Sequence, residues 1–246
     1  MNKYKFFILL FSFLFSIESD ISVTEIIEKI DFNLNSKNRF MKSKMIVHGR
    51  RASRTIVSES WVVGVNKAFT EYISPAREAG AKMLKIDDRL YTYSPQTDRI
   101  IQISGHMLRQ SIMGSDMSYN DILEDKPLND IYRATLEGEK LINGRKCYII
   151  YLEAIIEGLA YPKRRAWVDM EYFLPVREEL YAKSGKLLKS TSMDGIRKIQ
   201  DRWFPTIFIF KDELKKGSQG TEWIIEEISF NVDIPDSRFL KSNLRK

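Results

Sequence analysis

One early segment of the chain carries apolar residues at helical spacing. This stripe is typical of an amphipathic helix that packs one face on a core. Ser22 and Glu25 match a capping box, in which each side chain satisfies a free backbone amide of the first turn. The pattern therefore predicts a helix over residues 22–36. Its apolar positions are Val23, Ile26, Ile27, Ile30 and Leu34.

After this helix the apolar period changes to two. Short runs rich in β-branched and aromatic residues alternate with turn signals, which indicates strands joined by hairpins. Asn143-Gly144 is the strongest hairpin signal. Consecutive hairpins without helices between them predict a mainly β (α+β) fold with one large, curved antiparallel sheet. The predicted hairpin arms are residues 131–142 with 146–153, 172–182 with 187–199, and 203–214 with 223–232.

Residues 106–125 interrupt the alternation. Met107, Leu108 and Ile112 share a helical face, and Ser118 is placed to cap a second helix that contains Tyr119. The segment thus predicts two short helices inserted in the middle of the sheet.

Several strands are apolar on both faces, for example residues 147–152 and 203–210. Two interpretations fit. Either both faces are covered and the interior is filled, or the curved sheet encloses an apolar cavity under the inserted helices. Met113 and Met117, near Met107, favour a flexible lid, because methionine repacks around variable apolar partners. The same methionines also suit an ordinary core.

The N-terminus has the pattern of a secretory signal. Lys3 and Lys5 precede the apolar run 6–16, which is too short to span a membrane. We expect a cleaved signal peptide over residues 1–19 and one mature domain over residues 20–246; a retained anchor or a buried first helix are the alternatives. The only thiol, Cys147, lies far from this segment, so the usual lipoprotein acylation is not expected.

Composition removes most chemical classes. The net charge is +6, with basic and acidic residues interspersed, which does not indicate nucleic-acid binding. One cysteine and two histidines offer neither an internal disulfide nor a metal site. No nucleotide-binding or hydrolase motif occurs. We therefore predict no enzyme activity, no catalytic residue, no cofactor and no metal.

The segment 103–123, with Met-Gly-Ser-Asp-Met-Ser at 113–118, resembles the LolA/LolB-like superfamily, and within it the outer membrane lipoprotein-sorting proteins. Leu136-Glu137-Gly138, the segment 163–169 and Pro175-Val176-Arg177 add to this resemblance. The resemblance implies an incomplete β-barrel of about eleven strands whose concave face holds acyl chains. It also implies a periplasmic carrier that an inner-membrane ABC or RND-type transporter loads and an outer-membrane acceptor empties.

On this basis the chain is expected to be a monomeric carrier of the acyl chains of a lipid or lipoprotein. The alternative is a lipid-sensing module that regulates an envelope protein. The expected lid residues are Met107, Leu108, Ile112, Met113, Met117 and Tyr119. The expected cavity residues are Trp61, Val63, Phe69, Tyr91, Tyr93, Tyr148, Ile150, Trp167 and Phe208. The facing of each strand is open, because a shift of one residue reverses it.

Overall fold

The computed structural model describes residues 21–49, 51–123 and 126–246. The expected signal peptide lies outside these residues. The first element is helix α1 (Val23–Leu34), and its capping box is present: the Glu25 amide donates to Ser22 Oγ at 3.2 Å and the Ser22 amide donates to Glu25 Oε2 at 3.1 Å. The predicted N-terminal helix is thereby confirmed, two residues shorter at its end.

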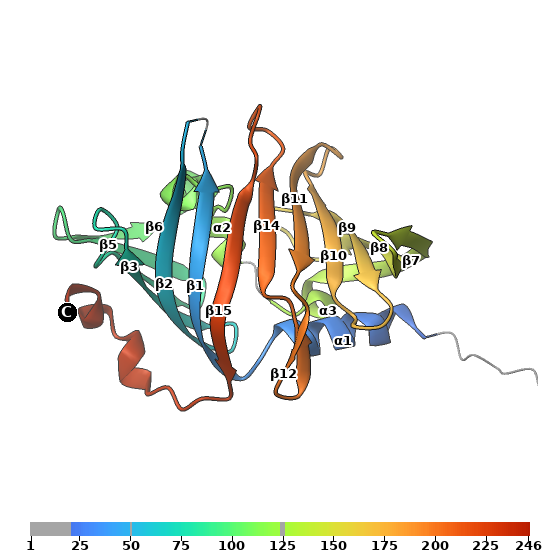
Figure 1. Cartoon of the computed structure of the whole chain (residues 1–246), viewed down its shortest axis with the longest axis horizontal. Helices are drawn as coiled ribbons and strands as arrows, with labels where there is room; N and C mark the ends of the chain where they lie inside the picture. Colours follow the sequence, from blue (N-terminus) through green and yellow to red (C-terminus); the bar gives the residue numbers. More distant parts are fainter. Residues whose placement is uncertain (1–20, 50, 124–125) are drawn as a thin grey trace, which may run out of the picture.

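Within the described residues, thirteen antiparallel strands form one curved sheet, in the order β6-β5-β4-β3-β2-β1-β15-β14-β11-β10-β9-β8-β7 (Figure 1). The sheet is open, with β6 and β7 at its edges. The strands are β1 (Asn38–His48), β2 (Ser53–Val63), β3 (Lys67–Ser74), β4 (Lys82–Ile86), β5 (Arg89–Ser94), β6 (Arg99–Ile103), β7 (Tyr132–Ile142), β8 (Arg145–Ala154), β9 (Lys163–Asp169), β10 (Pro175–Tyr181), β11 (Leu187–Asp194), β14 (Ile207–Asp212) and β15 (Thr221–Phe230).

The expected number of about eleven strands is too low. Two predicted strands, 187–199 and 203–214, are each broken, so that β12 (Arg197–Ile199) and β13 (Arg202–Phe204) form a separate small hairpin. The break follows from Gly195, which has φ 63°, and from Pro205, which has no amide to donate to a ladder. Thr206 Oγ1 donates to the Gly195 carbonyl at 2.9 Å and closes the junction.

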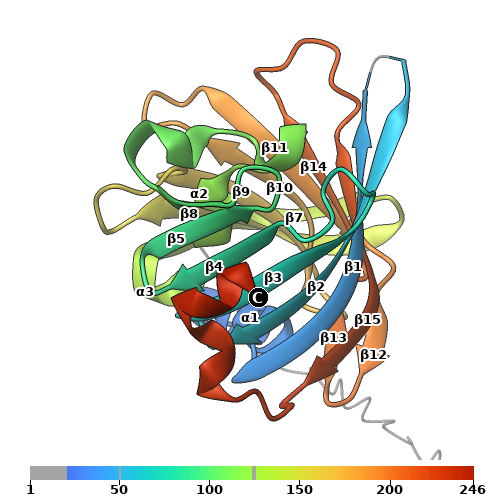
Figure 2. The same cartoon turned by 90° about the vertical axis from the view of Figure 1, so that its left-hand side faces the viewer.

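The concave face of the sheet is covered in two parts (Figure 2). Helix α1 and the short helix α3 (Leu128–Ile131) pack on β7, β8 and β9, where Ile26, Ile27 and Ile150 are fully buried. The predicted insert covers β1 to β6. It consists of two 3-10 turns, η1 (Gly105–Arg109) and η2 (Ile112–Gly114), followed by helix α2 (Tyr119–Leu123). The first predicted helix is therefore wrong in type, because consecutive left-handed residues Met113 and Gly114 interrupt it.

The convex face is covered as well, over β3 to β5. The C-terminal 3-10 turns η3 (Asp236–Phe239) and η4 (Lys241–Arg245) lie across these strands (Figure 2). Phe239 and Leu244 pack there against Phe69 and Leu84. This cover buries the convex face of β3 to β5. Within the described residues no helix has the length and apolar character needed to cross a membrane.

Candidate functional site

The insert, residues 105–123, is closed on itself by short backbone contacts. Met113 and Gly114 have φ values of 49° and 73°, so the chain turns back on itself there. The Ile112 amide donates to the Met117 carbonyl at 2.8 Å, and Ser111 and Ser118 form an isolated β-bridge. The insert is thus an ordered loop whose apolar side chains face the sheet.

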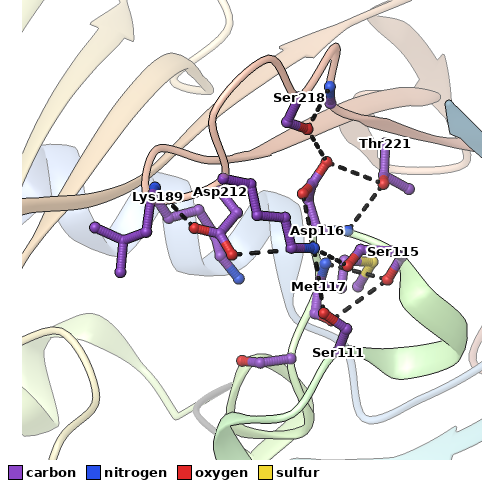
Figure 3. Close-up of polar contacts among 12 residues, drawn as sticks. Ser111, Ser115, Asp116, Met117, Lys189, Asp212, Ser218 and Thr221 are labelled. Atoms are coloured by element: carbon purple, nitrogen blue, oxygen red, sulfur yellow. Dashed lines mark hydrogen bonds and ion pairs between the residues drawn. The ribbon is translucent and has the colours of Figure 1, made fainter. Parts of the chain in front are cut away.

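Asp116 ties this loop to the hairpin between β14 and β15. Its side chain is buried and accepts hydrogen bonds from Lys215 Nζ at 3.0 Å and Ser218 Oγ at 2.8 Å (Figure 3). Its amide donates to Thr221 Oγ1 at 2.9 Å. Lys215 Nζ also donates to the Ser115 carbonyl at 2.7 Å. Charge-assisted hydrogen bonds of this kind are the stronger class, so Asp116 holds one end of the insert in place.

Asp121 ties the other end of the insert to β11. Its carboxylate forms an ion pair with Lys189 Nζ, and both side chains are buried. Tyr161 donates its hydroxyl to Asp121 Oδ1 at 2.7 Å, and the Ser118 amide donates to Asp121 Oδ2 at 2.6 Å. The sequence predicted Ser118 as the acceptor that caps this helix. In the structure Ser118 is the donor, and the Asp121 carboxylate is the acceptor. A buried pair gains little net stability but fixes geometry.

An apolar hollow of about 220 Å³ lies between the insert and the concave face. Trp223 and Phe210 form its wall on β15 and β14, and Met117 and Ile122 form its roof. Arg39, Lys85 and Asp121 give it one polar end. The remaining lining residues are Met41, Ser60, Val62, Ala68, Thr70, Met83 and Leu90.

Two further spaces adjoin the hollow through shared lining residues. A narrow one of about 60 Å³ shares Met83 and Met117 with the hollow. It shares Tyr72, Met83 and Ile112 with a wider cleft of about 410 Å³ between the insert and the β3–β4 loop. These three side chains therefore stand between the inner hollow and the outer cleft.

Three tyrosines line the cleft, Tyr72, Tyr93 and Tyr119, and the pKa of two of them is shifted. Burial raises the pKa of Tyr72, and the nearby Tyr119 raises it further; burial also raises the pKa of Tyr119. Both phenols therefore stay neutral near pH 7 and remain hydrogen-bond donors. They lie in a cleft whose lining combines apolar side chains such as Met83 and Ile112 with charged ones such as Glu78 and Arg99.

The expected lid residues all lie in one cluster with the strands β1 to β6. Ile112 and Met117 are buried, and the other four are partly buried. Ile112, Met113 and Tyr119 line the cleft, and Met117 lines the two inner spaces. Met107 and Leu108 belong to the same cluster but line none of these spaces.

The expected cavity residues lie mostly elsewhere. Trp61, Val63, Phe69 and Tyr91 are on the convex face, in the core under the C-terminal turns. Tyr93 belongs to that core too and borders the outer cleft. The facing of β2, β3 and β5 was therefore assigned in the wrong sense.

The other four expected cavity residues also lie outside these spaces. Tyr148 and Ile150 pack under α1, and Phe208 packs with Phe204. Trp167 contacts the Arg177 guanidinium, which lies 5.3 Å from its ring. In these places helices or neighbouring strands fill the interior.

The residues that line the hollow were missed because they alternate with those predicted. Val62 is next to Trp61, and Ala68 is next to Phe69. The same face carries Ser60 and Thr70, whose hydroxyls lie 2.9 Å apart. These two polar residues were the signal in the sequence that this face is not tightly packed. Trp223 and Phe210, in the C-terminal part, could be placed only by the sheet order.

Chemistry beyond binding has little support in the described residues. No three His, Cys, Asp or Glu side chains there are grouped as a metal site. Burial raises the pKa of the Cys147 thiol, which disfavours the reactive thiolate. The basic run at 163–165 is part of β9, where Arg165 pairs with Glu137 at 2.9 Å.

Comparison with known proteins supports the architecture. A family model with the description "Uncharacterized protein" matches residues 64–246. Among curated proteins none matches this sequence.

Three solved structures share the fold. An outer membrane lipoprotein-sorting protein domain from Vibrio parahaemolyticus has a TM-score of 0.76 at 20% identity, covering 90% of this chain and 97% of that one. A DUF1329 family protein from Desulfovibrio piger has a TM-score of 0.81 at 23% identity, with 89% and 96% covered. A LolA superfamily protein from Nitrosomonas europaea has a TM-score of 0.76 at 22% identity, with 91% and 99% covered. The chain therefore has the LolA-like fold.

Proposed function

The chain belongs to the protein family whose model matches residues 64–246, and from this membership and its LolA-like fold we propose that it is a carrier without catalysis. It holds the acyl chains of a lipid or lipoprotein in the hollow between the insert and the concave face of the sheet. The N-terminal pattern supports export, so the proposed place of work is the periplasm.

The observation that carries this proposal is the apolar hollow and its route to the surface. Its lining is dominated by flexible or flat side chains such as Met83, Met117 and Trp223, and methionine adapts to apolar ligands of variable shape. The narrow space at Tyr72 and Ile112 joins it to the cleft. Rotation of these side chains would make one channel from the cleft to the hollow.

The expected energy is adequate for retention. Each methylene removed from water contributes about 0.8 kcal/mol, so a chain of about sixteen carbons gains roughly 13 kcal/mol before ordering costs. Release then requires an acceptor that binds the chain equally well, or a displaced insert. An inner-membrane ABC or RND-type transporter and an outer-membrane acceptor are the proposed partners of a monomeric carrier.

The first experiment is direct. The mature chain is purified from an envelope fraction, and its extract is analysed by lipid mass spectrometry. We expect stoichiometric acyl lipid or, after delipidation, saturable binding of an apolar fluorophore. A protein that carries no lipid and binds no apolar fluorophore would refute the carrier proposal.

Substitutions at two methionines of the insert distinguish an effect on ligand binding from an effect on stability. Met113 is partly buried at the cleft, whereas Met117 is 8% exposed and belongs to the core. We expect Met113→Lys to reduce fluorophore binding more than the melting temperature, and Met117→Lys to reduce both. Loss of stability without loss of binding in Met113→Lys would make that residue part of the core rather than of the binding site.

A further inference from the structure

The cleft has a polar mouth formed by the β3–β4 loop and the start of β4. Glu78 and Lys82 both line it, and each is only 8% exposed. Buried charged side chains are costly unless they are paired and fully hydrogen-bonded. The partners of these two groups therefore indicate what the mouth accommodates.

Glu78 is half satisfied. Its Oε1 lies 3.3 Å from Arg54 Nη1, but its Oε2 is buried and accepts no hydrogen bond within the described residues. An ionised carboxylate has acceptor sites on both oxygens. Oε2 is thus an available acceptor for a donor that enters the cleft.

Lys82 has its partner on the other side of the sheet. It pairs across the strands with Glu71, two residues after the convex-face residue Phe69, and its Nζ lies 3.7 Å from Glu71 Oε1. Because alternate side chains of a strand point to opposite faces, its ammonium points away from the cleft. The side-chain cations of the cleft are then Arg77 and Arg99, both exposed.

We propose that this mouth binds a headgroup that carries both a phosphate and a primary ammonium, as in a phosphoethanolamine lipid. The inference rests on the proposed acyl-chain carrier. The phosphate is bound by Arg77 and Arg99, which both line the cleft, and the ammonium donates to Glu78 Oε2. The acyl chain runs past Tyr72 and Ile112 into the hollow.

Headgroups of other charge fit this mouth less well. A phosphoglycerol headgroup would engage the two arginines, but its neutral hydroxyls would give Glu78 Oε2 a weaker hydrogen bond than an ammonium does. A quaternary ammonium has no N–H to donate to Glu78 Oε2. The expected preference is therefore for a primary amine over a quaternary amine or a glycerol at equal chain length.

The test is displacement of an uncharged naphthylamine fluorophore from the delipidated mature chain. Lysophospholipids with one common acyl chain and ethanolamine, choline or glycerol headgroups serve as competitors, with free phosphoethanolamine as a tail-less arm. We expect the ethanolamine lipid to compete at a concentration about tenfold lower than the other two, the ratio expected from one charge-assisted hydrogen bond. Free phosphoethanolamine should not displace the fluorophore, because it does not enter the hollow.

Variants assign the preference to residues. Glu78→Gln should abolish the ethanolamine advantage while fluorophore binding persists, and Glu157→Gln, exposed in the β8–β9 loop, is the matched control. If Glu78→Gln does not fold, Arg99→Gln remains as a second variant, and it should weaken all three lysophospholipids about equally.

The outcomes separate the two proposals. Equal competition by all three lysophospholipids, or an ethanolamine advantage that survives Glu78→Gln, overturns the headgroup site and leaves the carrier in place. Failure of the wild-type chain to bind the fluorophore at all overturns the carrier itself.

Discussion

Filling the hollow is the most informative perturbation of this protein. Ala68 on β3 lines the hollow, opposite Val62 on β2 and Lys85 on β4. In Ala68→Phe a phenyl ring would project from the concave face into a space of about 220 Å³. The ring occupies room that an acyl chain would otherwise use.

The effect on binding follows from the carbons displaced. If the ring excludes about four methylenes, the bound state loses roughly 3 kcal/mol at about 0.8 kcal/mol each, which corresponds to roughly a hundredfold weaker Kd. The effect on stability has a different origin. Where space is available the ring is buried without strain, whereas overpacking of a filled core costs about 1–3 kcal/mol.

The assay measures both quantities on one sample. Titration of the delipidated chain with a fluorescent acyl probe gives Kd, and urea unfolding gives the free energy of unfolding. Ala182→Phe, at the β10–β11 turn, carries the same ring away from the hollow and should change neither. Ala68→Phe that destabilises the fold, or that binds the probe as tightly as wild type, would refute the assignment of this space to the ligand.

Three further predictions test other parts of the structure. Asp116→Ala removes the contacts that hold the insert, and we expect a loss of about 3 kcal/mol in stability with faster amide exchange across residues 105–118; unchanged exchange there would contradict the anchoring role. Burial raises the pKa of Asp31 to about 6 from 3.8, although Leu128 donates its amide to that carboxylate. Because this carboxyl binds its proton more tightly in the folded chain than in the unfolded chain, the free energy of unfolding falls as pH rises from about 4 to about 6. Asp31→Asn should remove this fall in the free energy of unfolding, measured by urea unfolding at each pH. An unaltered pH dependence would contradict the raised pKa of Asp31. Phe239→Ala should lower the free energy of unfolding by about 3–5 kcal/mol without weakening acyl binding, because its cluster lies on the convex face. Weaker binding by the folded variant would contradict a ligand site on the concave face.

Local signals in the sequence were sufficient for most of the elements. The capping box at Ser22 and Glu25 is a contact between residues three apart, so it forms wherever that helix forms. Asn143 and Gly144 have φ values of 49° and 81°, which is the turn that this residue pair favours. Both predictions depended only on neighbours in the chain.

The inserted segment was recognised but not its internal form. Its loss of alternation was visible from residue 106 onward. Its attachment to the sheet depends on Asp116, whose partners Lys215, Ser218 and Thr221 lie about a hundred residues away. No local pattern predicts such contacts, and the short turns are stable because of them.

The sequence by itself determined the class of fold, the position of the N-terminal helix and most hairpins, and the place of the insert, since these follow from periodicity and turn chemistry. Only the tertiary structure decided which face of each strand lines the hollow. Trp61 and Val62 are adjacent and both apolar, and what distinguishes them is that the C-terminal turns cover one face and the insert the other. When a strand is apolar on both faces, its sequence does not show which face is packed. Segments distant in the chain bury one face in a core and leave space beside the other.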